Sequence, residues 1–329
     1  MAKPTASDVH VNAPLTNMSV AYIQAADAYV ADKVFPTVPV LKQSDRYFVY
    51  DKGDFFRDQA KVRAPSTESA GGGFALDNTP TYYAYVYALH KDVDDQVRTN
   101  SDAALNPDRD ATEWLTQQLL IRRDNVWASN YFKTGVWSLD LTGVAAAPGV
   151  NQFLQWDDPT AKPAKDVHGE IARITEQTGF RPNVLVLGAR TYAALLENPD
   201  LLDRIKYTQR GVVTPEIMAG VFNVERVVIA YATNNTAKEF QGTDTPTMSY
   251  IANSKAALLV YANPSPSLMM PSGGYTFAWT GLLGAGATGS RIKRFRMEHL
   301  ESDRIEGELA FDMKLVSSDV GTFFNSAVS

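Results

Sequence analysis

The residues Gly284-Ala285-Gly286-Ala287-Thr288-Gly289 have the spacing of a dinucleotide-binding loop, G-x-G-x-x-G. In such a loop the glycines let the backbone approach a pyrophosphate, and a helix that begins inside the motif places its N-terminus on the negative charge. Here the next residues, 291–296, alternate like a strand instead. A Gly-rich turn between strands is therefore the favoured interpretation. A nucleotide-dependent enzyme that uses the Gly284–Gly289 loop stays open as a remote alternative.

Other residue types that carry chemistry are scattered or missing. The four histidines form no H-x-x-x-H pair: His10, His90, His168 and His299. The carboxylate pairs Asp94-Asp95 and Asp157-Asp158 lie in polar, loop-like contexts, where nothing indicates the shifted pKa that acid–base catalysis requires. With no cysteine, thiolate zinc sites and cysteine nucleophiles are excluded. The sequence predicts no catalytic, cofactor-binding or metal-binding residue, hence no cofactor and no enzyme.

One predicted strand near the C-terminus is rich in cations: Arg291, Lys293, Arg294 and Arg296. Three carboxylates follow it closely: Glu298, Glu301 and Asp303. Because these opposite charges are so near in sequence, we expect a salt-bridged interface strand. A patch that contacts phosphate groups remains the second interpretation.

The overall charge argues against a protein that reads nucleic-acid sequence. The chain of 329 residues has 31 Lys and Arg against 37 Asp and Glu, a net charge of −6, and no basic domain stands out. The first residues lack the apolar run of a signal peptide, so the expected compartment is the cytoplasm.

Residues 256–290 contain no charged residue and no histidine, which makes a membrane span the first interpretation to test. Prolines and a Gly273-Gly274 pair interrupt this stretch repeatedly, so no helix of spanning length is expected. Two short apolar blocks remain, Ala256–Tyr261 and Tyr275–Leu283. We expect two buried or subunit-covered strands joined by a turn, and no membrane partner.

Two parts of the N-terminal third do not look like a compact domain. Residues 1–45 combine sparse apolar positions, one short helical pattern and the extended path that Pro36 and Pro39 enforce, as in an arm. Aromatic strands at 47–50 and 82–89 then enclose roughly 30 polar and Gly-rich residues, far more than a hairpin turn needs. Both the arm and this two-stranded ribbon require a neighbouring surface to lie on.

A long helix and an α/β region follow. Asn106 is a suitable cap for a helix that begins at Pro107 and keeps one apolar face to Tyr131, about 37 Å long. Asp166 is expected to cap a further helix that stops at Gly179. Strands are expected at 184–187, 224–231, 292–300 and 308–315, with a helix over 191–197.

This order of parts resembles the major capsid protein of tailed bacteriophages, with the Hong Kong 97-type fold. The local sequence is similar as well. Phe35–Val40 followed by Asp45–Asp51 looks like the passage from arm to loop in one branch of that family. Asn183–Leu187 with Ala189–Tyr192, and then Asn198-Pro199, looks like the family's central strand and helix.

The resemblance implies an α+β fold with an N-terminal arm, an extended β-ribbon loop, a peripheral domain that carries a long spine helix, and an axial domain. The expected ranges are 1–45 for the arm, 46–90 for the extended loop, 91–164 and 262–304 for the peripheral domain with its spine helix at 107–131, and 165–261 and 305–329 for the axial domain.

The function that the resemblance implies is structural. The chain would self-assemble as pentamers and hexamers into an icosahedral shell that encloses double-stranded DNA without reading its sequence. A portal protein is an expected partner, and scaffold or decoration proteins are optional ones. The expected location is the virion, after assembly in the cytoplasm of a bacterial host. An encapsulin-like compartment shell of the same fold is the main alternative.

Some members of the family join their subunits by an isopeptide bond between a loop lysine and an asparagine on a late strand, assisted by a glutamate. Lys61 matches the loop lysine, and Glu301 or Glu306 the glutamate. However, no asparagine occurs between Pro264 and Phe324. We therefore predict a shell without covalent cross-links.

Overall fold

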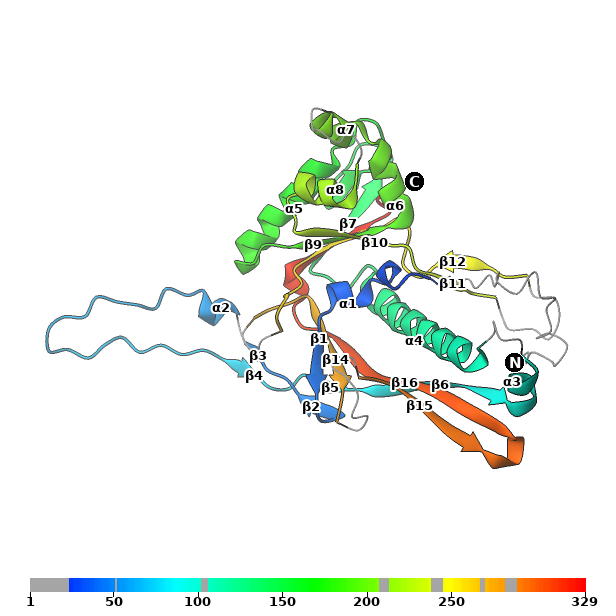
Figure 1. The fold of residues 1–329 in the computed structure, drawn as a ribbon. Coiled ribbons are helices and arrows are strands. Elements are labelled where there is room, and N and C mark those ends of the chain that lie inside the picture. The colour runs from blue at the N-terminus through cyan, green and yellow to red at the C-terminus, as the bar shows by residue number, and fades with distance from the viewer. Residues whose placement is uncertain are drawn as a thin grey trace.

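The computed structural model describes residues 24–50, 52–101, 106–206, 213–237, 245–266, 270–281 and 289–329. Helices and strands are mixed, as an α+β fold requires, and two separate sheets hold most of the strands. Figure 1 shows a body from which one long loop projects on the left. Among the described residues, none of the helices has both the length and the apolar character needed to cross a membrane.

The first sheet has five strands: β1 (Thr37–Val40), β6 (Tyr85–Asp94), β14 (Gly274–Trp279), β15 (Ser290–Met297) and β16 (Ser302–Leu315). The long strand β16 is central, because it pairs antiparallel with β14, β15 and β6. β1 adds to β14 in parallel. The predicted extended path through Pro36 and Pro39 is thereby confirmed.

The second sheet has six strands: β7 (Leu139–Val144), β8 (Gln152–Leu154), β9 (Val184–Gly188), β10 (Arg226–Ala230), β13 (Ala257–Val260) and β17 (Gly321–Asn325). β9 and β13 are buried at every position, which explains their continuous apolar sequence. Four helices lie with this sheet: α5 (Pro163–Thr178), α6 (Ala189–Glu197), α7 (Pro199–Ile205) and α8 (Pro215–Phe222).

The two faces of the second sheet belong to different cores. Leu185, Leu187 and Phe324 pack with apolar side chains of α5 to α8. Val186 and Leu258 point the other way, toward the long helix α4 and the first sheet. Because neighbouring strand residues alternate between faces, one sheet holds the two halves of the molecule together.

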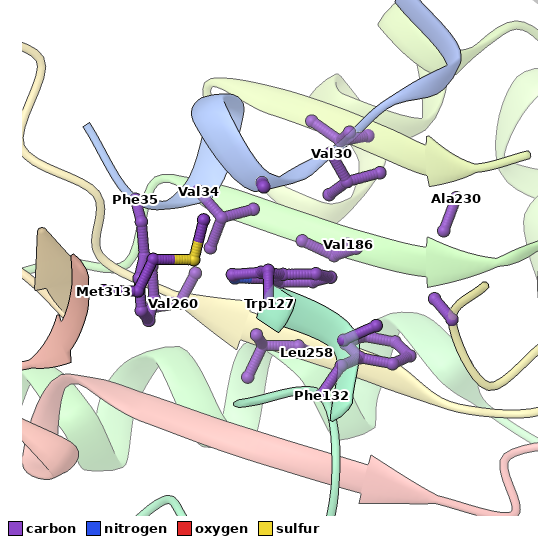
Figure 2. Packing of buried hydrophobic residues seen from close by; sticks show 14 of the residues in the cluster. Val30, Val34, Phe35, Trp127, Phe132, Val186, Ala230, Leu258, Val260 and Met313 are labelled. Atoms are coloured by element: carbon purple, nitrogen blue, oxygen red, sulfur yellow. The ribbon is translucent and has the colours of Figure 1, made fainter. Parts of the chain in front are cut away.

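Helix α4 (Pro107–Tyr131) has the bounds that the sequence predicted. The Asn106 side chain accepts a hydrogen bond from the Arg109 amide, as a cap does. Its buried face packs on β16 and β6 through Leu115 and Leu119. Near its end, Trp127 is fully buried between the arm and the second sheet (Figure 2). The helix therefore connects both sheets.

The charge-free stretch contains the two buried strands that the sequence predicted, but these strands do not pair with each other. Its two apolar blocks do form strands, but β13 lies in the six-stranded sheet and β14 in the five-stranded sheet. The physical reason is that β13 is paired on both edges, with β9 and β17, so that no edge is left for β14. The chain crosses between the sheets in the intervening residues, with a hydrogen bond from the Gly273 amide to the Tyr261 carbonyl at 2.9 Å.

The predicted start of the helix that stops at Gly179 was wrong. α5 begins at Pro163, and Asp166 lies inside its first turn. The Asp166 carboxylate accepts a hydrogen bond from Trp156 Nε1 at 3.1 Å instead of capping the helix. Gly179 does end the helix, in the left-handed region with φ +72°.

The arm also differs from the prediction that it needs a foreign surface throughout. Residues 1–23 lie outside the described residues, but Val30, Val34 and Phe35 are completely buried in the chain's own core (Figure 2). This segment includes the short helix α1 (Ala31–Val34) and packs beside Trp127. Its apolar spacing thus serves the body of the same chain.

Two of the expected domain limits fall inside single secondary-structure elements. The boundary at 304/305 falls inside β16, and the boundary at 164/165 falls inside α5. β7 and β8, which the ranges place in the peripheral domain, belong to the six-stranded sheet. Long-range pairing decides which sheet a strand joins, and the local sequence does not show that pairing.

Candidate assembly surfaces

In the described residues, a strand and not a helix follows the motif that was singled out for nucleotide chemistry. Residues 284–288 of the G-x-G-x-x-G match lie outside the described residues. Gly289 has φ +66° and is followed directly by β15, which begins at Ser290. The predicted strand after the motif is confirmed, and no helix begins in the described residues from 289 to 297.

The other candidate chemical residues are held apart. His90 lies in β6, His168 in α5 and His299 in the short helix η3 (Glu298–Leu300), while His10 lies outside the described residues. His168 Nε2 forms a hydrogen bond with the Val221 carbonyl oxygen at 3.0 Å. Across the part of the chain that the structure describes, no group of three or more His, Asp or Glu side chains is arranged to hold a metal ion.

The carboxylate pairs do structural work. Asp94 caps helix α3 (Asp95–Asn100) by accepting a hydrogen bond from the Gln96 amide at 2.7 Å. Asp157 accepts hydrogen bonds from the amide and the hydroxyl of Ser329, which fastens the last described residue to the body.

All four cations of β15 are ion-paired, as the sequence predicted for a salt-bridged strand. On the sheet face turned away from α4, Arg291 and Lys293 both contact Glu308, at 2.8 and 2.6 Å. Lys293 also reaches Glu306 at 3.0 Å. Because these cations already have carboxylate partners, their charges are neutralised locally, which argues against a patch that contacts phosphate groups.

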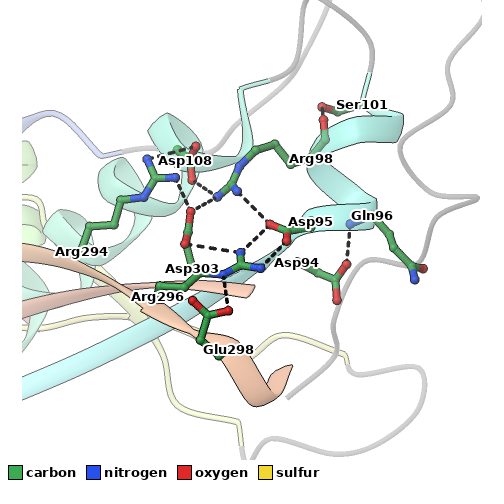
Figure 3. Close-up of polar contacts among 10 residues, drawn as sticks. All are labelled: Asp94, Asp95, Gln96, Arg98, Ser101, Asp108, Arg294, Arg296, Glu298 and Asp303. Carbon is green, nitrogen blue, oxygen red and sulfur yellow. Dashed lines mark hydrogen bonds and ion pairs between the residues drawn. The ribbon is translucent and has the colours of Figure 1, made fainter. Parts of the chain in front are cut away.

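The remaining cations of β15 point to the face that carries α4, where they join a network at the end of the sheet (Figure 3). Arg294 and Arg296 both pair with Asp303 of β16. Arg296 also forms an ion pair with Asp95 at 2.6 Å, and Arg98 of α3 forms an ion pair with Asp303 at 3.0 Å. Sequence reasoning found Asp303 but missed Arg98 and Asp95, since β6 and α3 are about 200 residues away along the chain.

Ion pairing sets the charge state of this network. The hydrogen bond from Arg296 lowers the pKa of Asp95 below its ordinary value of 3.8. The hydrogen bond from Arg294 does the same for the pKa of Asp303. Both carboxyl groups therefore stay ionised throughout the physiological pH range.

Acid is expected to loosen this end of the sheet. A depressed folded-state pKa contributes stability above the unfolded value, and that contribution is lost as the pH falls below about 3.9 and through the folded pKa. We expect the thermal unfolding midpoint of the wild type to fall between pH 5 and pH 3. Asp303→Asn should be less stable at pH 7 and should lose the part of this pH dependence that Asp303 contributes. An unchanged pH profile in that variant would contradict the assigned role of Asp303.

The projecting loop, residues 52–80, is the most exposed part of the described chain. It starts at helix α2 (Lys52–Phe55) and is joined at its base by two short ladders: β2 (Ser44–Arg46) with β5 (Thr81–Tyr83), and β3 (Val49–Tyr50) with β4 (Leu76–Asp77). Every residue from 60 to 79 is exposed. Figure 1 shows this loop reaching far beyond the body. The predicted ribbon is confirmed here only at its base, because β6 leaves it to pair with β16.

Aromatic side chains gather at the loop base. Phe55 and Phe74 lie 5.2 Å apart between ring centroids, and both contact Tyr50. Phe56 lies against Gly179 at the end of α5, where a Cβ atom would stand 2.9 Å from its ring. Tyr50, Phe55 and Phe56 contribute to the lining of a groove of about 690 Å³. Phe55, Phe56 and Phe74 stay half or more exposed, which is typical of a surface that another molecule covers.

The attachment of the arm depends on one buried carboxylate. Asp124 of α4 is 2% exposed and accepts hydrogen bonds from the amides of Val30 and Ala31 at 2.9 and 2.8 Å. Beside it, Arg123 pairs with Asp32. Burial raises the pKa of Asp124, although the two amides and Arg123 oppose that shift.

Removing this carboxylate should detach the arm. Asp124→Ala leaves two buried amides without an acceptor, and we expect the free energy of unfolding to fall by about 2 kcal/mol or more. Asp124→Asn keeps one acceptor oxygen and should lose clearly less. Urea unfolding of the three proteins measures the difference. Equal stability of the alanine variant and the wild type would show that the amides find another acceptor.

Two curated relatives are similar to the chain over most of its length. The major capsid protein of Pseudomonas phage JBD67 is 26% identical over 326 residues, which covers 97% of both chains. The major capsid protein of Burkholderia phage BcepMu is 24% identical over 233 residues, 68% of this chain and 69% of that protein. No family model matches the chain.

Solved structures share the fold. A phage-related protein from Bordetella bronchiseptica RB50 has a TM-score of 0.65 at 20% identity, covering 91% of this chain and 92% of that one. The capsid of a native GTA particle has a TM-score of 0.58 at 15% identity, with 94% and 93% covered. The holo encapsulin complex from Synechococcus elongatus PCC 7942 has 0.53 at 12%, with 100% and 98% covered. The chain has the Hong Kong 97-type fold, and the predicted resemblance to major capsid proteins is confirmed.

Proposed function

We propose that this chain is the major capsid subunit of a tailed bacteriophage, which assembles as pentamers and hexamers into an icosahedral shell around double-stranded DNA. The observation that carries the proposal is the projecting loop on a body with the capsid fold. Such a loop buries little against its own chain, so another molecule must cover it. Both relatives are named as major capsid proteins.

The role is structural. The described residues that sequence analysis singled out for catalysis serve as caps, ion pairs and backbone contacts instead. Large surfaces that fit one another are what a shell subunit needs, and heterologous contacts between copies close into rings when the rotation permits.

The parts of the fold take the following roles in this proposal. The five-stranded sheet with α4 forms the peripheral domain, and the six-stranded sheet with α5 to α8 forms the axial domain around the centre of each capsomer. The projecting loop lies over a neighbouring copy. In this division no strand or helix is split between domains. All of β16, residues 302–315, belongs to the peripheral domain, and the helical part of the axial domain begins at residue 163.

Partners follow from the same role. A portal protein occupies one vertex, scaffold or decoration proteins are optional, and the DNA is held without sequence readout. A net charge of −6 suits a container whose DNA is neutralised largely by counterions. The subunit resides in the virion and assembles in the cytoplasm of the bacterial host.

A protein compartment is the second candidate, because the encapsulin complex covers this chain completely at a TM-score of 0.53. The names of the two relatives favour the phage capsid. The test is to purify native particles, digest external nucleic acid with nuclease, and determine what stays protected. Protected double-stranded DNA of uniform length supports the capsid. Particles that hold only protein cargo would overturn it in favour of the compartment.

We expect the shell to be held without covalent cross-links. Lys61 is exposed on the projecting loop, but Glu306 is already paired with Lys293, and strands β14, β15 and β16 contain no asparagine. Mature particles boiled in denaturing detergent should therefore run as a single band near 36.1 kDa. A ladder of multiples that persists under reducing conditions would contradict this prediction.

A further inference from the structure

The chain passes between its two sheets three times: between β6 and β7, between β13 and β14, and between β16 and β17. The described residues that make these passes after α4, β13 and β16 are 132–138, 261–266 with 270–273, and 316–320. Figure 1 shows the six-stranded sheet above and the five-stranded sheet below. Any change in the angle between the two sheets must therefore bend these passes.

Backbone hydrogen bonds join the three passes to one another. The Ser138 amide donates to the Ser318 carbonyl at 3.2 Å, which joins the first pass to the third. The Tyr261 amide donates to the Val320 carbonyl at 3.0 Å, which joins the second pass to the third. The three passes are thus one hydrogen-bonded unit, which we call the junction.

One aromatic side chain fills the centre of the junction. Trp137 is 5% exposed, and its Nε1 donates to the carbonyl of Tyr131, the last residue of α4, at 2.9 Å. A Cβ atom on Gly273 would stand 3.0 Å from the Trp137 ring and 2.5 Å from Val260. A Cβ atom on Gly321, the first residue of β17, would overlap the same ring. The indole of the first pass therefore lies directly against the backbone at the ends of the other two.

This contact leaves the ring no freedom to move. Gly273 and Gly321 serve close approach, not an unusual backbone, because neither has a positive φ. Movement of the ring toward either glycine meets backbone, and movement away opens a gap that dense interior packing resists. Helix α4 also contacts both sheets, but through side chains, and packed side chains permit small sliding movements.

We propose that Trp137, held against Gly273 and Gly321, fixes the angle between the two sheets, and that this angle sets the curvature of the shell. The second half of the proposal rests on the proposed function. In a shell, surfaces on both sheets contact other copies, so a fixed angle keeps the rotation between neighbouring copies within a narrow range. Closed particles of uniform size require such a constant rotation.

The angle is measured first in the isolated subunit. Because the chain has no cysteine, Ala88→Cys on β6 and Glu176→Cys on α5 provide two defined sites for spin labels, and both positions are exposed. Pulsed electron paramagnetic resonance should give a narrow distribution of label distances in the otherwise wild-type chain. Adding Trp137→Leu should broaden it by roughly twofold or more, because leucine leaves part of the space empty. A distribution as narrow as before would overturn the proposal.

Trp156→Leu is the matched control. Trp156 is fully buried, and its ring packs against Phe153 and Phe324 in the core between the six-stranded sheet and its helices. The same substitution there removes as much packing without touching the junction, so the label distances should stay narrow. Equal broadening in both variants would show a general loosening and would overturn the role of Trp137. If the leucine variant yields no soluble protein, Trp137→Phe decides by the same comparison.

Electron microscopy of assembled particles tests the second half of the proposal. Wild-type and Trp156→Leu particles should have one diameter, whereas Trp137→Leu should give a range of diameters roughly twofold wider or more, with open or tubular forms. Uniform particles of wild-type diameter from a variant with broadened label distances would overturn the link between angle and curvature. A wild type that never assembles would refute the proposed function instead, and the label distances alone would then decide the role of Trp137.

Discussion

Replacing Trp127 with alanine is expected to lower the free energy of unfolding by about 3–5 kcal/mol. Trp127 is fully buried where α4, the arm and the six-stranded sheet meet. Its ring lies near Val34, Val186 and Leu258, so its loss opens a cavity shared by three elements. The arm and the sheet both depend on it for their position on α4.

Chemical unfolding of the isolated subunit, followed by circular dichroism, measures this effect. Leu202→Ala is the control, because Leu202 lies on α7 with 40% of its surface exposed and should cost little. We expect the Trp127 variant to yield little soluble protein and no particles. A loss of less than about 1 kcal/mol would mean that the surrounding side chains collapse into the space or that the arm is not anchored there.

Removing the outer part of the projecting loop is expected to abolish assembly without unfolding the subunit. Residues 58–73 can be replaced by a four-residue Gly-Ser turn, since the rings of Phe55 and Phe74 on either side lie 5.2 Å apart. The deleted residues are nearly all exposed and contribute little to the core. The unfolding midpoint should therefore stay within a few degrees of the wild type, while closed particles disappear.

Sedimentation velocity and thermal unfolding, applied to the same sample, separate the two effects. Gly71→Ala is the matched control, because a Cβ atom at this loop position meets nothing within 4 Å. Normal particles from the shortened chain would show that the loop is dispensable. A large drop in the unfolding midpoint would show that it belongs to the fold of its own chain.

The sequence predicted well whatever local chemistry determines. Asn106 followed by Pro107 marks the start of α4 because the cap and the missing amide suit a first turn. The cations of β15 and the carboxylate of Asp303 are near enough in sequence for their pairing to be foreseen. Likewise, a Gly-rich stretch without helix signals was correctly expected to lead into a strand.

Long-range pairing was harder to foresee. β16 could be recognised as a strand, but nothing local shows that β6 pairs along ten of its residues or that β13 and β14 part into different sheets. The arm was misjudged for the same reason. Its apolar residues pack against Trp127, and two of its amides donate hydrogen bonds to Asp124, some 90 residues away. The spacing of apolar residues cannot identify a partner so distant in sequence. The pairing of β6 with β16 also brings Arg98 and Asp95 into the ion-pair network at the end of the five-stranded sheet.

Negative-stain electron microscopy of the purified full chain over a range of concentrations shows directly whether the subunits assemble. The proposed function predicts capsomer rings, tubes or closed shells of uniform curvature, with particle number rising steeply above a threshold concentration. A folded protein that stays a dispersed monomer at every concentration and salt condition would contradict it.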